Sequence, residues 1–228
     1  MNTSSTTLRS RGFTLVEILV VLALLSMLLF MAVPGLKGTT AGSRVAQTAD
    51  QFVQHMAIAR QAAIKENIPV EVRLYKYNQT GVSGGDTPAF SAWQMYRLRQ
   101  DMNEPVNYSL PSITVPILEK VARVANGVAL VESKRWSSLV ADDDLNRGRQ
   151  LVRGLVPGVK ETDTEYVSFI ISPDGSTSLD RSGAKQWYVT FVDDIELKRN
   201  SSVEDMKPKD FITIQLDPYT ASTRWFRP

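Results

Sequence analysis

The hydrophobic positions fall into three patterns along the chain. Residues 13–33 form one apolar run that contains a single charged residue, Glu17. Over residues 43–66 the apolar residues recur at alternating spacings of four and three, which predicts a helix with one apolar stripe. That stripe comprises Val45, Ala49, Phe52, Met56, Ala59 and Ala63. From Val70 onward, short segments alternate between apolar and polar positions, which predicts β-strands.

The apolar run predicts a transmembrane helix over residues 13–34. Its 21 residues would span about 30 Å as a helix, the thickness of the hydrocarbon core of a bilayer. Arg9 and Arg11 precede it without an acidic residue, which places the N-terminus in the cytoplasm. A cleaved secretory signal peptide is one alternative, but the run exceeds the usual length of about 7–15 residues and no clean cleavage site of small residues follows it. A plain signal anchor is another, although it gives no reason for Gly12 or Glu17.

The rest of the pattern predicts an α+β fold. Pro34 and the glycines that follow it indicate a kinked or loosened helix over 34–42, and the helix then continues over 35–67 until Asn67 and Pro69 end it. Residues 68–228 are expected to form a β-rich domain whose antiparallel sheet packs against that helix. We expect strands at Val70–Tyr77, Trp93–Arg99, Ile113–Val124, Val128–Glu132, Tyr166–Ser172, Trp187–Val192 and Phe211–Leu216. Residues 78–91 and 193–210 are expected to be loops, and 137–163 show no clear pattern.

Composition and charge exclude several functions. The chain has no cysteine, which excludes disulfides, thiolate metal sites and a cysteine nucleophile. Of its 26 Lys and Arg, only Arg9 and Arg11 lie in the first twelve residues, and the other 24 equal the 24 Asp and Glu. The remainder is therefore neutral overall, so charge gives no indication of a general nucleic-acid-binding surface.

Residue types that could carry chemistry favour structural roles. The only histidine, His55, has no partner set for a catalytic triad or a metal site, so we expect it at the surface or an interface. Asp142–Asp144 could bind a cation, but without EF-hand spacing a solvated loop is favoured. Gly84-Gly85-Asp86 lacks the lysine and helix of a phosphate loop. Trp93, Trp136 and Trp187 are expected in the core or on a sheet face. We expect no enzyme, no catalytic residue, no cofactor and no metal.

The start of the chain resembles a known signal. The segment Arg11-Gly12-Phe13-Thr14-Leu15-Val16-Glu17 is similar to the class III signal of type IV prepilins and type II secretion pseudopilins. The resemblance implies a leader peptide over residues 1–12, cleavage between Gly12 and Phe13 by prepilin peptidase, and methylation of the Phe13 amine. It also implies that Glu17 pairs with the Phe13 amine of a neighbouring subunit during assembly. Thr14 to Glu17 also fits a capping box, a local explanation for the acid that is compatible with the assembly role, which we favour.

Segments further along resemble the GspH/FimT-type minor pseudopilins. They are residues 59–70, the Pro173-Asp174-Gly175 turn and residues 214–220 with Arg224. The prepilin-type "Verru_Chthon cassette protein D" group ends in similar segments. The departure is Ala221-Ser222, where the wider family has Thr-Gly-Arg.

The resemblance implies a minor pseudopilin or minor pilin subunit. It would assemble through its N-terminal helix with other such subunits into a type II secretion or type IV pilus filament. It would sit in the bacterial inner membrane as a single-pass protein, with its C-terminal domain in the periplasm. One alternative is a DNA-binding minor pilin acting in uptake, because Arg224, Trp225 and Arg227 could contact phosphates and bases. We favour a final strand or a protein contact for this tail, with nucleic acid the less favoured partner. Another alternative is a membrane-anchored surface protein that never polymerises.

Overall fold

The structure, a computed structural model, describes residues 14–77, 89–99, 113–118, 120–156, 159–199, 203–204 and 206–227. Of residues 29–41, 99, 113–114 and 198–199 it describes the backbone only. The chain divides into two compact units, Met1–Thr40 and Ala41–Pro228. The observed fold class is α+β, as the sequence predicts, with helices and antiparallel sheets.

A single helix, α1 (Leu15–Glu66), begins in the first unit and ends in the second. Its backbone is helical throughout residues 34–42, because glycine and proline lower helix propensity without preventing a helix. Its end agrees with the prediction. Asn67 adopts a left-handed conformation with φ +52, and the Ile68 amide donates to the Ala63 carbonyl over 3.3 Å, as at many helix C-termini.

The larger sheet, sheet A, has the strand order β3-β2-β1-β7-β6, and β4 also pairs with β2. Its neighbouring strands are all antiparallel. The strands of sheet A are β1 (Val70–Tyr77), β2 (Ala89–Arg99), β3 (Ile113–Pro116), β4 (Ala122–Arg123), β6 (Asn146–Arg153) and β7 (Glu161–Ile171).

The smaller sheet, sheet B, has the order β10-β9-β8-β5 and is also antiparallel. It consists of β5 (Val128–Leu130), β8 (Trp187–Asp193), β9 (Phe211–Leu216) and β10 (Thr223–Phe226). Two short helices complete the fold: α2 (Ser138–Ala141) precedes β6 in the chain, and α3 (Asp194–Arg199) follows β8.

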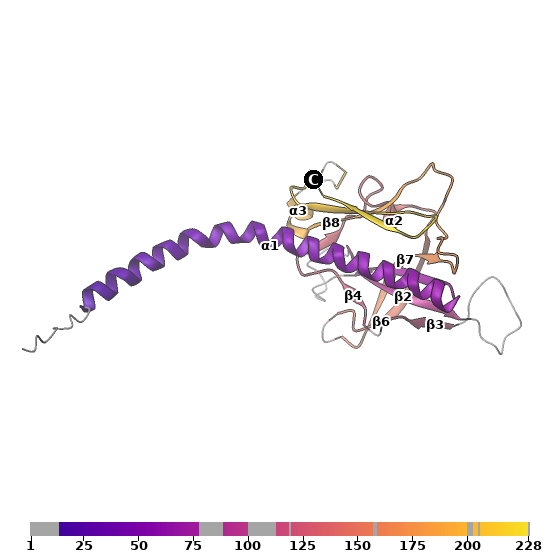
Figure 1. Cartoon of the computed structure of the whole chain (residues 1–228), viewed down its shortest axis with the longest axis horizontal. Coiled ribbons are helices and arrows are strands. Elements are labelled where there is room, and N and C mark those ends of the chain that lie inside the picture. The colour runs from indigo at the N-terminus through magenta and orange to yellow at the C-terminus, as the bar shows by residue number, and fades with distance from the viewer. Residues whose placement is uncertain are drawn as a thin grey trace, which may run out of the picture. The chain divides into compact units, whose positions relative to one another are not determined.

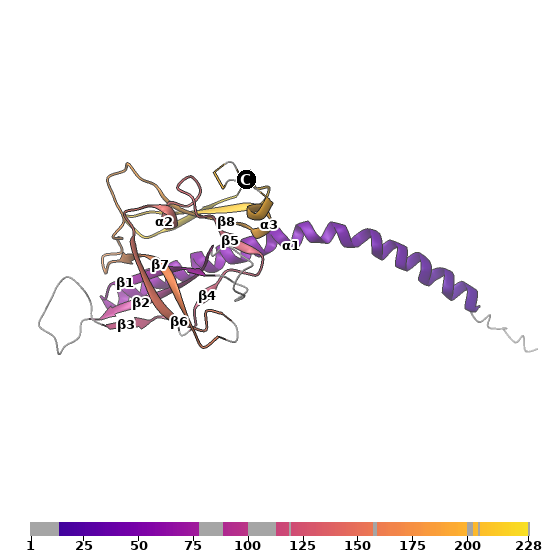
Figure 2. The same cartoon turned by 180° about the vertical axis from the view of Figure 1, so that it is seen from behind.

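The main core lies between α1 and the two sheets. The predicted stripe from Val45 to Ala63 is buried, and it joins Val72 and Trp93 of sheet A and Phe191 and Ile214 of sheet B in one cluster. Within the second unit, α1 lies in front of β2 and β7 in Figure 1 and behind those strands in Figure 2. The helix therefore covers one face of sheet A.

The other face of sheet A is buried as well. Tyr75, Tyr96 and Val152 form a second cluster there with Leu155. Both faces of β1 are therefore buried. Val70, Val72 and Leu74 face α1, and Tyr75 and Tyr77 face the second cluster.

Several predicted element boundaries were wrong. The predicted loop 78–91 overlaps β2, which begins at Ala89, and its residues 78–88 lie outside the described residues. The single strand predicted over 113–124 is two strands, because Pro116 ends β3 and lacks an amide to continue the ladder. Residues 137–163 contain α2, β6 and the start of β7. The predicted loop 193–210 begins with the last residue of β8 and contains α3.

Candidate functional site

Thr14 caps the first turn of α1. Its hydroxyl oxygen accepts a hydrogen bond from the Glu17 amide over 3.2 Å, and its carbonyl accepts from the Glu17 and Ile18 amides. This is the Ncap half of the capping box that the sequence predicts. The Glu17 side chain itself is exposed, and among the described residues its carboxylate has no hydrogen-bond or ion-pair partner. Its charge is therefore available to a group from another molecule.

The apolar side chains after Thr14 are exposed around the whole helix. Leu15 is 79% exposed and Leu28 is 64% exposed, and the apolar residues between them are exposed too. The one hydroxyl within residues 18–28, Ser26, donates to the Leu22 carbonyl over 2.7 Å, so it needs no external partner. Covering such a surface with lipid or with other apolar helices removes it from water and lowers the free energy. None of the helices in the described part of the chain has the length and apolar content that crossing a membrane requires.

The residues of the predicted cleavage and methylation site, Gly12 and Phe13, lie outside the described residues. Glu17 is the one residue of the predicted N-terminal site that the structure describes. The helix start at Leu15 places Glu17 in the first turn, where the helix dipole stabilises a carboxylate.

The predicted tail contact is an edge strand. Arg224, Trp225 and Phe226 belong to β10, whose partner is β9. The sequence leaves open that Trp225 or Phe226 docks on the sheet, but these side chains are 53% and 54% exposed. Arg227 follows the strand and lies next to α1: a Cβ added at Gly42 would be 3.4 Å from Arg227 Nη2 and 3.6 Å from Asp210 Oδ1. The tail therefore exposes its aromatic residues but brings its last arginine near an acid.

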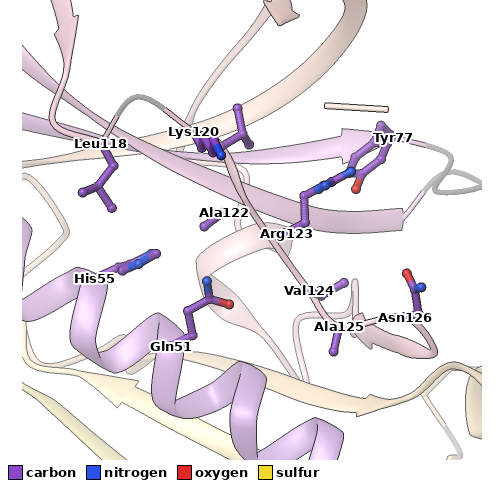
Figure 3. A pocket seen from close by; sticks show the side chains of 11 residues that line it. Gln51, His55, Tyr77, Leu118, Lys120, Ala122, Arg123, Val124, Ala125 and Asn126 are labelled. Atoms are coloured by element: carbon purple, nitrogen blue, oxygen red, sulfur yellow. The ribbon is translucent and has the colours of Figure 1, made fainter. Parts of the chain in front are cut away.

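His55 lies in a groove between α1 and the segment 118–126. Figure 3 shows His55 and Gln51 on α1 facing that segment, which carries Lys120 and Arg123. The groove has a volume of about 900 Å³. The Trp93 indole N–H donates to His55 Nδ1 over 3.0 Å, so neutral His55 carries its proton on Nε2.

His55 has the environment of a structural residue. Burial lowers its pKa from the ordinary value of 6.5, because the charged form loses solvation. Among the described residues it bonds to no hydroxyl or carboxylate that could form a catalytic triad, and no group of three His, Asp or Glu is arranged to hold a metal. The hydrogen bond to Trp93 ties this part of α1 to sheet A.

Lysines pair with the three aspartates that could have bound a cation. Lys185 bonds to Asp144 and, over 2.9 Å, to Asp142. Lys134 bonds to Asp143. The bonds to Asp144 and Asp142 raise the pKa of Lys185. The prediction of a merely solvated loop was incomplete, because the aspartates that bear the charge are ion-paired.

The tryptophans are placed as predicted. Trp93 and Trp187 are buried in the main core, and the Trp187 indole donates to the Asp180 carbonyl over 2.9 Å. Trp136 packs edge-on against Phe211, with ring centroids 5.5 Å apart. Gly84-Gly85-Asp86 lies outside the described residues.

Two turns that the sequence singled out meet in space. In the Pro173-Asp174-Gly175 turn, Gly175 has φ +84, and a Cβ there would be 3.4 Å from Ile64 Cδ1 of α1. Two residues later, the Thr177 amide and hydroxyl donate to the Pro218 carbonyl over 2.9 Å and 3.0 Å. The two turns thus join the ends of β7, β9 and α1.

A buried polar network on the second face of sheet A was not predicted. The Tyr75 and Tyr96 hydroxyls are 2.8 Å apart, and Gln150 Nε2 donates to both. Arg73 bonds to Gln150 and Glu71, and its guanidinium stacks between Tyr96 and Tyr166 at 4.6 Å and 4.8 Å from their ring centroids. The polar residues that alternate along β1 were the only signal, since Gln150 comes from a strand that the pattern did not predict.

Comparison with protein families gives one match. Residues 7–33 match the family model described as the prokaryotic N-terminal methylation motif. No curated protein and no solved structure matches the chain. The motif indicates a type IV pilin-like prepilin substrate and favours a structural subunit, and it implies prepilin peptidase and a pilin-type assembly as the kind of partner. The chain thus carries the signal of membrane-anchored pilin-like proteins.

Proposed function

We propose that this protein is a minor pseudopilin or minor pilin subunit, of the GspH/FimT type or the Verru_Chthon cassette group, that assembles into a type II secretion or type IV pilus-type filament. The observation that carries the proposal is the methylation motif over residues 7–33. Prepilin peptidase removes residues 1–12, and the new Phe13 amine is methylated.

The apolar surface of α1 supports the assembly role. Residues 13–33 carry one charge in an otherwise apolar run, and the side chains from Leu15 to Leu28 are exposed. Before assembly this segment spans the inner membrane, with the N-terminus cytoplasmic and the β-rich domain periplasmic. In the filament, the same surface packs against neighbouring helices.

Glu17 determines how far each subunit is offset along the filament axis from its neighbour. An unpaired carboxylate within apolar surroundings costs several kcal/mol, and its exposed side chain is free to pair with the Phe13 amine of the next subunit. The pairing removes that cost only when the subunits have the correct axial offset.

Processing tests the proposal directly. Full-length protein from wild-type cells and from cells without prepilin peptidase is compared by intact mass spectrometry. We expect a mature N-terminus at methylated Phe13 in wild-type cells alone, and an uncut precursor for Gly12→Leu. An intact Met1 in both strains, or an N-terminus beyond residue 33, contradicts the proposal.

A second experiment separates assembly from simple anchoring. A filament subunit is expected to cross-link to neighbouring pilin-like subunits through cysteines introduced at Leu19 or Leu22. A membrane-anchored surface protein that does not polymerise gives the processed chain without such cross-links. The DNA-uptake alternative has less support, because the chain after residue 12 is neutral overall and Arg227 lies near Asp210.

A further inference from the structure

Strand β10 is an exposed edge of sheet B. It occupies one end of the order β10-β9-β8-β5, and no other strand in the described part of the chain pairs with its second side. Arg224, Trp225 and Phe226 are all exposed. The strand thus combines a free backbone edge with large side chains.

The backbone register shows which groups face outward. The Asp217 amide donates to the Ser222 carbonyl over 2.9 Å, and bonded pairs alternate with non-bonded pairs along an antiparallel ladder. The register pairs Arg224 with Gln215 and Trp225 with Ile214. Arg224 therefore directs its amide and carbonyl toward β9, whereas Thr223 and Trp225 direct theirs outward.

The register also assigns the side chains to faces. Trp225 lies opposite Ile214, a buried core residue, so Thr223 and Trp225 lie on the face of sheet B that packs toward α1. Arg224 and Phe226 lie on the opposite face. An added strand would therefore meet apolar and hydroxyl groups on one face, and a cation beside an aromatic ring on the other.

The strands at the other ends of the two sheet orders are protected. β6 is exposed and carries arginines that pair with acids of β7, as in Arg149 with Asp163 and Glu165 and Arg153 with Glu161. β3 ends in the exposed Pro116, and all three residues of β5 are buried. Charges, proline and burial are the usual means of preventing unwanted strand pairing. β10 lacks all of these features except one arginine.

We propose that β10 binds an extended segment of a different protein by strand addition, an inference that rests on the proposed role in a multi-subunit assembly. The segment pairs with the outward groups of Thr223 and Trp225. It places apolar residues opposite those two residues and an acidic residue opposite Arg224, because opposite charges on directly paired residues are favourable. A second acidic residue of the segment pairs with Arg227.

A second copy of this chain fits the edge poorly. β10 runs alongside α1 in the opposite direction, since Arg227 lies at Gly42 while Pro218 joins the segment that contacts Ile64. A two-fold pair of β10 strands would leave the two α1 helices running in opposite directions, which does not suit chains anchored in one membrane. Pairing β10 with the exposed edge β6 would bring Arg224 near the arginines of that strand.

A strand peptide tests the proposal. The probe is a fluorescent peptide, Thr-Glu-Tyr-Val-Glu-Val-Thr, titrated with the full-length protein in detergent and measured by anisotropy. Its control replaces each Glu with Lys. We expect at least tenfold tighter binding of the Glu peptide, and we expect Arg224→Glu to reverse this preference. Equal binding of the two peptides, or no binding at millimolar protein, overturns the proposal.

A matched pair of variants tests the backbone contact. Trp225→Ala and Trp225→Pro both remove the indole, but only the proline removes the outward amide, and neither removes a bond to β9. We expect binding of the Glu peptide to be lost in Trp225→Pro and retained, though weakened, in Trp225→Ala, at equal thermal stability. Equal binding by both variants overturns strand addition. A self-association of the wild type that Arg224→Glu abolishes overturns the proposal that the bound segment belongs to a different protein.

The processing assay keeps this proposal separate from the proposed function. Cleavage at Phe13 depends on the N-terminal segment and not on β10. A chain that is processed but does not bind the peptide refutes the strand-addition proposal alone. A chain that binds the peptide but retains residues 1–12 refutes the prepilin role alone.

Discussion

Gly148 and Tyr166 show how a single missing side chain shapes this domain. They are direct partners across β6 and β7, and a Cβ at Gly148 would lie 2.6 Å from the Tyr166 hydroxyl and 2.7 Å from its ring. Tyr166 in turn stacks on the Arg73 guanidinium. The glycine therefore makes room for the ring that covers the buried polar network.

We predict that Gly148→Ala destabilises the protein by about 1–3 kcal/mol, because the added methyl group overpacks a filled site. Urea unfolding of the purified protein measures the change. The control is Gly42→Ala, where the nearest atom is at 3.4 Å, an ordinary contact. There we expect no loss or a gain of up to about 1 kcal/mol, since alanine favours a helix. Equal effects of the two changes would contradict the role of Tyr166.

The second prediction at this scale concerns His55. Burial lowers its folded-state pKa below 6.5, so the unfolded chain binds the proton more readily. The stability that this supplies is present above about pH 6.5 and is lost as the pH falls through the lowered pKa. We expect the urea midpoint to fall between about pH 7.5 and about pH 5.5 in the wild type, and to fall less in His55→Gln.

The glutamine introduced by His55→Gln would retain an acceptor for the Trp93 indole, so this change tests the charge and not the hydrogen bond. Aspartates such as Asp174, whose pKa is lowered by bonds from Ser176, titrate in a lower window and do not interfere. An unchanged pH dependence in His55→Gln would show that His55 does not control stability in this range.

Residue types alone predicted only part of these environments. The spacing of His55, Asp142 and Asp144 predicted structural roles for them. Their actual partners, Trp93 and Lys185, are 38 and up to 43 positions away in the chain. Pairings at such distances depend on the sheet order, which no local pattern specifies.

At the scale of elements, the first turn of α1 combines a local and an intermolecular role. The Thr14 hydroxyl accepts a hydrogen bond from the Glu17 amide. This bond stabilises the helix start whether or not the side chain of Glu17 is charged. We predict that Glu17→Gln leaves the helix content unchanged, because the cap belongs to Thr14, but impairs filament assembly. Circular dichroism and cross-linking of Leu19→Cys chains measure the two outcomes.

Thr14→Ala is the matched control for Glu17→Gln. It removes the cap and is expected to destabilise the helix start by about 1 kcal/mol, while the charge of Glu17 remains and assembly continues. If Glu17→Gln chains are cleaved, insert and cross-link as efficiently as the wild type, pairing with the Phe13 amine is not needed for assembly.

Elements with a regular pattern were predicted well, and irregular ones were not. β1 and β9 have the predicted bounds, because apolar residues alternate along them. β6 was missed because it is an exposed edge whose arginines and glycine resemble a loop. α3 was missed because its six residues are too few for a helical period to appear.

At the scale of the whole molecule, segments that are distant in the chain meet at one end of the main core. The 173–175 turn, the 217–220 turn and the end of α1 meet through Gly175, Thr177 and Pro218. Sequence predicted the 173–175 turn and predicted that the α1 stripe would pack on a sheet. It did not predict that the strands form two sheets, because strand pairing is decided by side-chain fit across the core.

The last prediction concerns where this core begins along α1. The compact unit starts at Ala41, and the first turns after that point contact the sheets. Arg44 donates to the Asn126 carbonyl over 3.1 Å and pairs with Asp193 over 3.4 Å. The Thr48 hydroxyl accepts a hydrogen bond from the Ala125 amide over 3.2 Å. Val45 and Ala49 are each 1% exposed.

We therefore predict that a fragment of residues 41–228 folds cooperatively, whereas one of residues 50–228 is less stable by about 3–5 kcal/mol. The shorter fragment loses a buried valine, worth about 1.5–3 kcal/mol, a hydrogen bond worth about 1 kcal/mol, and the burial of Ala49. Urea unfolding monitored by tryptophan fluorescence compares the two, since Trp93 and Trp187 lie in the core that both fragments retain. Equal unfolding midpoints would mean that residues 41–49 do not belong to the core, and failure of the longer fragment to fold would mean that residues before Ala41 are needed for it.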